Sequence, residues 1–286
     1  MPASREVVCL VIALGVLAGC AGPSKHDRAP KRPPDVSNIP DAVPRAEPRS
    51  KSGNPPFYEV FGERYYVKQT AKGHVEKGVA SWYGEKFHGR RTSSGETYDM
   101  YAMTAAHKTL PLPTYARVTN LKNGRSVVVK INDRGPFIDN RIVDLSYSAA
   151  KRLDMITQGT AFVELETIDP GERATPVRAS SKPAPTRPAS PPPVAQAPRV
   201  TLAGGTRSRD DMYVQAGAFG QSDNADALAD KIRNNGIDGV VVQKDVSGGR
   251  TLYRVRVGPV TGVDHYDWMV ARMTELGIKD AYLAVD

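Results

Sequence analysis

The chain has 286 residues, a formal net charge of +8 and only two cysteines. This length suggests about two domains of ordinary size. Cys9 falls in a segment that we expect to be removed, so the mature chain keeps only Cys20 and an internal disulfide is excluded. The domains must therefore be stabilised by hydrophobic cores, and the positive charge points to anionic partners such as wall polymers or lipid headgroups.

The chain begins with an apolar run that is typical of an export signal. Arg5 precedes the run from Val7 to Leu17, which is too short to cross a bilayer core about 30 Å thick. The run ends in Leu17-Ala18-Gly19-Cys20, which resembles a bacterial lipobox, where the cysteine is acylated and becomes the new N-terminus. We therefore expect a signal peptide over residues 1–19 and a lipid anchor on Cys20. An ordinary signal peptide with an incidental cysteine is the alternative.

The expected export of the chain bears on which anionic partner its positive charge would meet. It argues strongly against nucleic acid, which is the usual partner of a strongly basic protein. The residue after Cys20 is Ala21 rather than aspartate, and this favours the periplasmic face of the outer membrane by the sorting rule of enteric bacteria. The inner membrane is the alternative if that rule does not apply to this organism.

Two segments are polar and rich in proline. Residues 20–74 contain eight prolines between Pro30 and Pro56, and residues 169–210 include three consecutive prolines. Such segments bury too little apolar area to offset the entropy lost on ordering. We therefore expect two disordered or polyproline linkers, which leave folded units at 75–168 and 211–286.

The first folded unit reads as mainly β with one helix. Asn123-Gly124 lies between two strand-like runs and is a strong hairpin signal. Ser146 is a candidate N-cap for a short helix that ends near Leu153. Many short strands with one helix in about 90 residues indicate a small closed barrel. The expected strands contain β-branched residues in partial alternation, at 78–83, 115–120, 126–131 and 161–165.

The second folded unit contains an internal repeat. A strand that ends at Gly217 is followed by a helix that ends at Gly236, and the same order returns from Gly258 to Gly277. Glycine can adopt the left-handed conformation that ends a helix. Two strand–helix–strand units in tandem predict an α+β, RNP-like βαββαβ sandwich, with both helices on one face of the sheet and the other face open for binding.

Three titratable residues of the first unit stand out, namely Glu96, His107 and Asp133. Asp133 follows a valine-rich strand and enters a Gly-Pro turn, where the scaffold can hold a carboxylate rigidly. Each of the three also has an ordinary structural explanation, as a turn residue, a solvated loop residue or a structural histidine. The five histidines show no metal-ligand spacing, so we expect no metal and no other cofactor.

A dense set of motifs in the first unit resembles the rare lipoprotein A family, and the second unit resembles a SPOR domain. The first resemblance implies a six-stranded double-psi β-barrel, related to the barrels of expansins. Together they imply two domains joined by disordered, Pro-rich linkers. The motifs of the first unit are Ala80-Ser81-Trp82-Tyr83-Gly84, His88-Gly89-Arg90-Arg91-Thr92, Gly95-Glu96-Thr97-Tyr98-Asp99-Met100, Thr104-Ala105-Ala106-His107, Leu110-Pro111-Leu112-Pro113, Val118-Thr119-Asn120, Asn123-Gly124-Arg125, Asn132-Asp133-Arg134-Gly135-Pro136-Phe137 and Asp144-Leu145-Ser146. Those of the second are Tyr213-Val214-Gln215-Ala216-Gly217-Ala218-Phe219 and Arg254-Val255-Arg256-Val257-Gly258-Pro259.

The family resemblance implies a septal lytic transglycosylase that acts on peptidoglycan strands stripped of stem peptides and leaves 1,6-anhydro-muramic acid ends. It also implies that division-machinery proteins are candidate partners. The family's functional residues fall on Glu96, His107 and Asp133. One carboxyl can act first as acid and then as base in this reaction, because no water nucleophile is needed. We expect Asp133 in this role, Glu96 either to stabilise the positive charge that develops at C1 or to raise the pKa of Asp133 by proximity, and His107 to orient one of them; the assignment between Asp133 and Glu96 is open.

Further residues are candidates for glycan contact. Sugar rings stack on aromatic faces, but an aromatic residue in this unit can equally be part of the core. Arg254 and Arg256 alternate with apolar residues, so both face the same side of the sheet. The candidates in the barrel are Trp82, Tyr83, His88, Tyr98 and Arg134, and those in the SPOR unit are Gln215, Arg254 and Arg256.

Two other functions are considered. The first is a non-catalytic, expansin-like glycan-binding lipoprotein, because a fold alone does not establish activity. The second is an RNA-binding protein, because βαββαβ also describes RNA-recognition domains. That function needs an aromatic strand motif which the run from Tyr253 to Val257 lacks, and the export signal argues against it.

Overall fold

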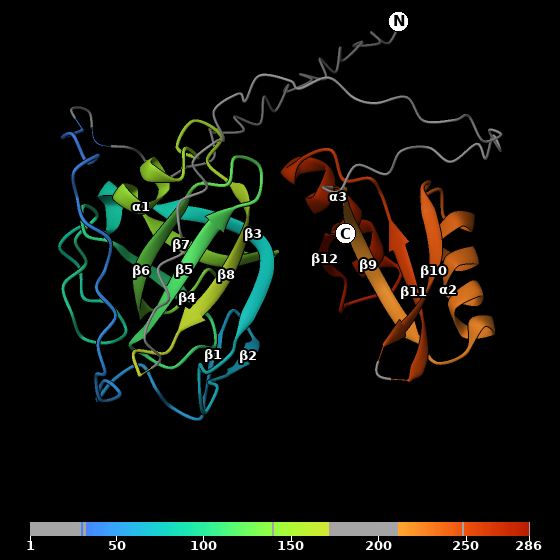
Figure 1. Cartoon of the computed structure of the whole chain (residues 1–286), viewed down its shortest axis with the longest axis horizontal. Helices are drawn as coiled ribbons and strands as arrows, with labels where there is room; N and C mark the ends of the chain where they lie inside the picture. Colours follow the sequence, from blue (N-terminus) through green and yellow to red (C-terminus); the bar gives the residue numbers. More distant parts are fainter. Residues whose placement is uncertain (1–29, 31–32, 139, 172–210, 248, 286) are drawn as a thin grey trace, which may run out of the picture.

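The computed structural model describes residues 30, 33–138, 140–171, 211–247 and 249–285. Two folded units are visible, a barrel and a sheet covered by helices (Figure 1). Both expected folds are thereby confirmed. The proposed lipid anchor at Cys20 and most of the second linker lie outside the described residues. In the part of the chain that is described, no helix is long and apolar enough to cross a membrane.

Six strands close the barrel in the order β3-β7-β4-β6-β5-β8. Two of the contacts are parallel, β3 with β7 and β4 with β6, and the others are antiparallel. The strands are β3 (Val75–Tyr83), β4 (Thr104–His107), β5 (Thr114–Asn120), β6 (Ser126–Asp133), β7 (Arg141–Ser146) and β8 (Ala161–Ile168). The parallel contacts bring residues from distant parts of the sequence into register, and this determines where the candidate site forms.

Local signals in the barrel sequence act as expected. The hairpin between β5 and β6 turns at Gly124, whose φ is +71°. Helix α1 (Tyr147–Arg152) begins after Ser146, whose hydroxyl accepts a hydrogen bond from the Ala149 amide. A short 3-10 helix, η1 (Glu85–Phe87), follows β3. Inward-facing aliphatic side chains fill the barrel, among them Val118, Val127, Val129, Ile131, Val143, Leu145, Val163 and Leu165.

The N-terminal segment differs from the linker that its composition predicts. Residues 33–74 pack against the barrel, and Val36 is only 2% exposed. The Ala42 and Ser50 amides donate to the carbonyls of Val128 and Leu112 at 3.0 and 2.9 Å. A hairpin of β1 (Phe57–Val60) and β2 (Glu63–Tyr66) completes the segment. We call residues 33–74 the strap; the prediction of disorder over this range is corrected, because its few apolar residues find pockets on the barrel.

The second unit is a four-stranded antiparallel sheet in the order β10-β11-β9-β12. Its elements are β9 (Met212–Phe219), α2 (Ser222–Asn234), β10 (Val240–Ser247), β11 (Arg250–Val257), α3 (Val263–Glu275) and β12 (Tyr282–Val285). Both helices end at the expected glycines, Gly236 and Gly277, which have φ values of +77° and +81°. One face of the sheet forms a core with the helices, and the face that carries Arg254 and Arg256 lies opposite.

Candidate functional site

The candidate site is a row of residues across four neighbouring strands of the barrel. Ser81 on β3 pairs with Asp144 on β7, and Asp144 pairs with Ala106 on β4. Ala106 also pairs with Asp133 at the end of β6. Residues directly opposite one another in a sheet point to the same face. The row therefore brings two carboxyl groups to one face, with small side chains beside them.

Asp133 is held from three directions. Its Oδ1 accepts hydrogen bonds from the Ser93 amide at 2.8 Å, the Ser93 hydroxyl at 2.6 Å and the Arg134 amide at 2.8 Å. The Ser93 donors come from the loop that precedes Glu96, so this loop fixes the carboxylate. Such preorganisation is what a catalytic carboxylate requires.

Asp144 is the acidic residue that the sequence analysis missed. It is partly buried and accepts a hydrogen bond from the Ser81 hydroxyl. Burial raises the pKa of Asp144 to about 6, although the Ser81 hydrogen bond and the positive charges of Arg141 and Lys108 oppose the rise. A carboxyl whose pKa is raised by burial can donate a proton near neutral pH. The only sign of Asp144 in the sequence was its place in the motif Asp144-Leu145-Ser146, which is part of the family resemblance.

Glu96 lies beside this row but makes no direct contact with Asp133. Its Oε1 is 2.8 Å from the Lys130 ammonium, and its Oε2 accepts from the Asn132 amide at 2.6 Å. Lys130 also binds Glu47 of the strap at 2.9 Å. Burial alone would lower the pKa of Lys130, but its hydrogen bonds to Glu96 and Glu47 outweigh this effect and raise it. Glu96 is therefore held by two residues of β6, Lys130 and Asn132, which lie three residues and one residue before Asp133.

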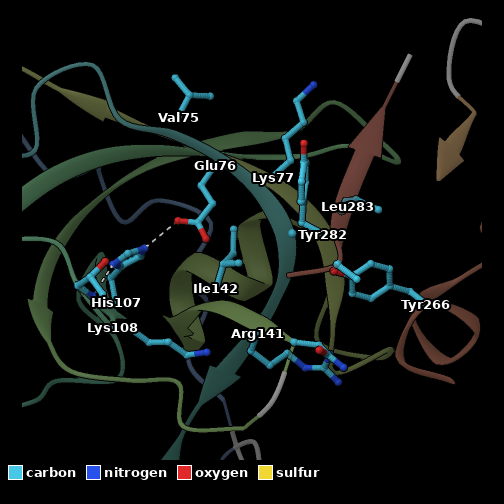
Figure 2. Close-up of a pocket in the computed structure, with 14 residues that line it drawn as sticks. Val75, Glu76, Lys77, His107, Lys108, Arg141, Ile142, Tyr266, Tyr282 and Leu283 are labelled. Carbon is cyan, nitrogen blue, oxygen red and sulfur yellow. Dashed lines mark hydrogen bonds and ion pairs between the residues drawn. The ribbon is translucent and has the colours of Figure 1, made fainter. Parts of the chain in front are cut away.

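His107 lies apart from Glu96 and Asp133, one of which it was expected to orient. Its ring is 3% exposed, and its Nε2 is 3.3 Å from Glu76 Oε2 (Figure 2). Its Nδ1 accepts from the amides of Thr109 and Leu110, both at 3.1 Å. Burial lowers the pKa of His107, although Glu76 acts in the opposite direction. These bonds use both ring nitrogens, and none of them goes to Glu96 or Asp133.

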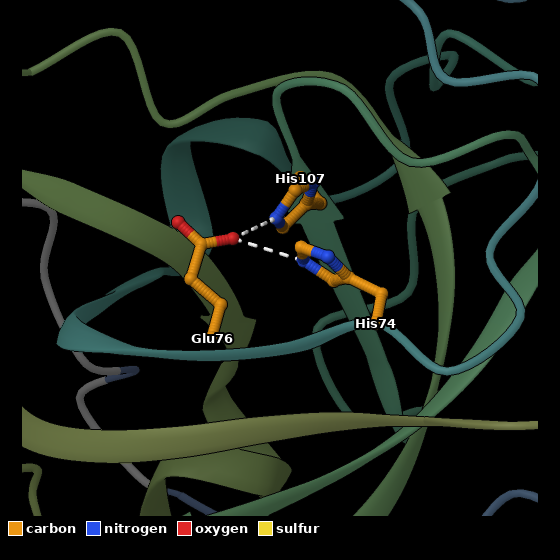
Figure 3. Close-up of side chains that lie close together, drawn as sticks. All are labelled: His74, Glu76 and His107. Carbon is orange, nitrogen blue, oxygen red and sulfur yellow. Dashed lines mark hydrogen bonds and ion pairs between the residues drawn. The ribbon is translucent and has the colours of Figure 1, made fainter. Parts of the chain in front are cut away.

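The structure also brings His74 to Glu76, a cluster that sequence spacing does not indicate. His74 Nε2 is 3.0 Å from the same Glu76 oxygen, and the possible ligand atoms of His74, Glu76 and His107 lie within 4.8 Å of one another (Figure 3). Burial alone would raise the pKa of Glu76, but hydrogen bonds from His107 and His74 outweigh this effect and lower it well below its usual range.

The hydrogen bonds of this cluster do not fit a metal ion. His107 Nδ1 accepts from two backbone amides, so it carries no proton and Nε2 must carry one. His74 Nδ1 is 2.9 Å from the Lys68 ammonium, which has only protons to offer when charged, and this assigns the proton of His74 to Nε2 as well. A metal would need lone pairs at both Nε2 atoms. The cluster is therefore a carboxylate that accepts two imidazole N–H groups.

Arg134 connects the strap to the site. Its Nε and Nη2 donate to the Gly53 carbonyl at 2.9 and 2.6 Å. Its Nη1 donates to the carbonyls of His107 at 3.1 Å and Leu110 at 2.5 Å. Arg134 was expected to contact glycan, but these bonds occupy its guanidinium. It fixes the position of Asp133, its neighbour in the chain.

Most of the expected aromatic residues are packed against other rings. Tyr98 is 2% exposed, stacks on Tyr83 with ring centroids 4.1 Å apart and donates to the Tyr83 carbonyl. Trp82 packs against Tyr147 at 6.0 Å. His88 is more accessible, and its Nδ1 accepts from the Met100 amide at 3.2 Å. Tyr83 and Tyr98 therefore have packing roles, and His88, whose side chain is 45% exposed, is the most accessible residue of this group.

Other aromatic residues lie at the surface beside Asp133. A cavity of about 420 Å³ is lined by Ser93 and Arg134 together with Tyr58 and Phe137. The rings of Tyr58 and Phe137 meet edge to face at 6.1 Å. Tyr58 comes from the strap, so sequence analysis excluded it by treating that segment as a linker. Aromatic faces beside a carboxylate are suited to binding sugar rings.

The open sheet face of the second unit carries the other expected glycan-binding residues. Arg256 donates to Gln243 at 2.9 Å, and Arg254 forms an ion pair with Asp245 at 3.1 Å. Gln215 donates to the Tyr282 hydroxyl at 2.5 Å. Gln215 pairs with both Arg256 and Tyr282 in the sheet, so these three side chains point to the same face, where Gln215 itself is only 3% exposed.

Comparisons with known proteins agree with both halves of the structure. A family model described as lytic transglycolase matches residues 75–165, and a SPOR domain model matches residues 208–282. The chain is 42% identical over 282 residues to the endolytic peptidoglycan transglycosylase RlpA of Pseudomonas aeruginosa (strain UCBPP-PA14), covering 86% of this chain and 82% of that protein. It is 51% identical over 170 residues to the protein of the same name from Vibrio cholerae, covering 58% of this chain and 64% of that one. The crystal structure of the RlpA SPOR domain from P. aeruginosa is 25% identical, with a TM-score of 0.25, and covers 26% of this chain and 99% of that one.

The fold and site define a class of protein in which a double-psi β-barrel bearing a pair of carboxyl groups is followed by a SPOR domain. Within that class, the chain belongs to the RlpA family of endolytic peptidoglycan transglycosylases. The resemblance drawn from the sequence motifs is confirmed.

Proposed function

We propose that this protein is a lytic transglycosylase that cleaves the bond between N-acetylmuramic acid and N-acetylglucosamine in peptidoglycan strands without stem peptides. The products end in 1,6-anhydro-muramic acid. Family membership supports the substrate and the reaction class. The observation that carries the proposal is the raised pKa of Asp144, about 6, in a carboxyl that shares a face with Asp133.

Asp144 is the general acid in this proposal, in place of Asp133. At pH 7 a carboxyl with a pKa near 6 is protonated in about a tenth of the molecules, which is sufficient for a general acid. Asp144 donates its proton to the glycosidic oxygen as that bond breaks. The resulting carboxylate then accepts the proton of the C6 hydroxyl, which attacks C1 and closes the anhydro ring. One residue completes both transfers, so no water-activating base is required.

Asp133 stabilises the positive charge that develops at C1. Three donors fix its Oδ1, and among the described residues no hydrogen bond reaches Oδ2. An anionic oxygen held in place near the reacting carbon lowers the barrier without reorganisation. Glu96 and His107 are positioning residues: Glu96 holds the end of β6 through Asn132, and His107 holds the backbone of residues 109 and 110, whose loop Arg134 also binds.

The remaining parts of the chain bring the barrel to its substrate. The sequence Leu17-Ala18-Gly19-Cys20 supports a lipid anchor, and the SPOR domain supports binding to denuded glycan at the division septum. Anchoring at the periplasmic face of the outer membrane, with division-machinery proteins as partners, is part of the same proposal. Tethering raises the effective concentration of the enzyme at its substrate.

The test measures the products formed from peptide-free glycan strands by mass spectrometry. The wild-type chain is compared with Asp144→Asn, Asp133→Asn and Asp154→Asn, the last being an exposed aspartate paired with Arg125. We expect 1,6-anhydro ends from wild type and Asp154→Asn, and a loss of at least about a hundredfold in the other two. Reducing ends would indicate a hydrolase, and binding without products would indicate a glycan-binding protein that is not an enzyme.

A further inference from the structure

The barrel and the SPOR domain contact each other through matched side chains. Arg141 on β7 forms a two-point ion pair with Asp267 on α3, at 2.9 and 2.8 Å. Phe162 on β8 meets Tyr266 edge to face, with ring centroids 5.7 Å apart. Phe162 and Val79 of the barrel are buried in the same cluster as the SPOR core. A planar two-point pair and an aromatic contact fix orientation as well as proximity.

A cavity of about 670 Å³ lies along this contact (Figure 2). The barrel lines it with residues of β3, β7 and the end of β4, and the SPOR domain lines it with Tyr266 and residues 281–283. Its volume falls within the range of about 300–1,000 Å³ that is typical of ligand sites. Because both domains contribute walls, neither domain alone forms this cavity.

One cation that lines the cavity has no carboxylate partner. Arg141 is paired with Asp267, and Lys77 is paired with Glu164 at 3.3 Å. Among the described residues, Lys108 forms no ion pair; its ammonium lies 6.0 Å from the centre of the Tyr65 ring, and Figure 2 shows Lys108 among the lining residues. Glu76 also lines the cavity, but its carboxylate accepts from two histidines. An anionic ligand group would therefore find its counter-charge at Lys108.

The SPOR side of the cavity offers an aromatic ring. Tyr282 is 49% exposed and lines the cavity, and its hydroxyl accepts a hydrogen bond from Gln215 on the open sheet face. On the barrel side, the positive charge of Lys108 acts to lower the pKa of Asp144, although burial raises it overall. Ile142, which also lines the cavity, lies two residues before Asp144 on β7, so both side chains point to the same face of the strand. The lining residues Ile142 and Tyr282 therefore connect the cavity to the barrel site and to Gln215 of the SPOR sheet.

We propose that this cavity is a saccharide subsite that binds an N-acetylmuramic acid residue, with its lactyl carboxylate on Lys108 and a sugar face on Tyr282. The identity of the saccharide rests on the proposed function. Removal of the stem peptide is what exposes this carboxylate, so the subsite selects denuded strands. A single strand would run from the SPOR sheet to the barrel acid, and the SPOR domain would then present substrate to the active site as well as locate the septum.

The test is an equilibrium binding measurement with the full chain in detergent, in an Asp144→Asn background so that strands are not cleaved. The probes are peptide-free glycan strands and the same strands with their muramic carboxylates converted to methylamides. Lys108→Met should bind the acidic strands about tenfold more weakly and the amidated strands as the Lys108 parent does, because one charge-assisted bond is lost. Lys108→Arg should keep the affinity within about twofold. Lys151→Met, at an exposed lysine on α1, is the matched control and should bind normally.

Asp267→Asn tests whether both domains are needed. If the cavity forms only when the two domains are in contact, Asp267→Asn should bind the acidic strands about tenfold more weakly, as Lys108→Met does. The proposal is overturned if Lys108→Met binds acidic strands normally, if it weakens both probes equally, or if Asp267→Asn keeps full affinity. Failure of wild type to produce anhydro ends would refute the proposed function but leave the binding comparison intact, so the two results can be distinguished.

Discussion

Asp133 on β6 and Asp144 on β7 are both strand partners of Ala106 on β4. Two strand spacings, about 10 Å, therefore separate their backbones on a shared face. Their surroundings differ: Asp133 is held by three donors, whereas burial raises the pKa of Asp144 to about 6. Two carboxyls in unlike environments divide naturally into a proton donor and an ionised group.

The pKa of Asp144 predicts the pH dependence of cleavage. The acid must be protonated, so kcat/KM should fall tenfold per pH unit above about pH 6. The Ser81 hydroxyl stabilises the ionised form of Asp144 and lowers its pKa, so Ser81→Ala should move this decline to higher pH by roughly half to one pH unit. The measurement is the initial rate of anhydro-end formation between pH 5 and 9.

Thr97→Ala is the control for Ser81→Ala, because it removes a hydroxyl from an exposed loop position. Its pH profile should coincide with that of wild type. An unchanged profile for Ser81→Ala, with normal rates at low pH, would show that Asp144 is not the group whose protonation limits the reaction.

The strap should behave as part of the barrel when its buried residue is changed. Val36 is 2% exposed and packs against Tyr83, Tyr98 and other residues of a buried cluster. Val36→Asp places a carboxylate there and should lower the free energy of unfolding by about 2–4 kcal/mol. Val43→Asp makes the same change in the same segment at a residue that is 63% exposed, and should cost less than about 0.5 kcal/mol. Equal effects in urea-induced unfolding would mean that the strap is not folded against the barrel.

Local patterns predicted most of the fold. The repeat that ends in Gly236 and Gly277, the Asn123-Gly124 hairpin and the Ser146 cap depend on neighbours in the sequence, and all were confirmed. The strap was missed because a proline-rich composition indicates only that a segment does not fold in isolation. It does not show whether Val36 finds a pocket on an existing surface.

The sequence predicted Asp133 but not Asp144, because the position of Asp144 in the site depends on how distant strands pair. The Asp133 position is marked by a strand end and a turn, both readable locally. The placement of Asp144 and the contact of Glu76 with His107 depend on the strand order β3-β7-β4-β6, in which β7 lies between β3 and β4. Which residues face each other across such contacts follows from strand order, and spacing along the chain does not contain that order.

Glu76 should stabilise the barrel in a pH-dependent way. Its pKa is lowered by hydrogen bonds from His107 and His74, although burial opposes this, so ionised Glu76 favours the folded state. Its contribution is complete above the ordinary glutamate pKa of 4.5 and is lost as the pH falls through its lower folded value. Because 36% of the side chain is exposed, Glu76→Gln should cost only about 1 kcal/mol at pH 7, with the difference from wild type shrinking below pH 4.5.

Glu164→Gln is the matched control for this effect. Glu164 is also 36% exposed and pairs with Lys77 on the same barrel, but no histidine contacts it. Its substitution should change the free energy of unfolding by less than about 0.5 kcal/mol at any pH between 4 and 8. A Glu76→Gln loss that does not depend on pH would refute the role of its charge.

The open face of the SPOR sheet should bind denuded glycan through Arg256. Its Nη1 donates to Gln243 at 2.9 Å, and its guanidinium lies 6.0 Å from the centre of the Tyr213 ring, so the side chain is fixed over the sheet. Arg256→Ala should weaken binding of peptide-free strands about five- to tenfold, because an ordered cation loses little entropy when it meets an anionic sugar polymer. Arg233→Ala removes an arginine on α2, away from this face, where it is already paired with Asp230, and should leave binding unchanged. If both variants lose affinity equally, the attraction is a property of net charge, and the open sheet face has no specific role.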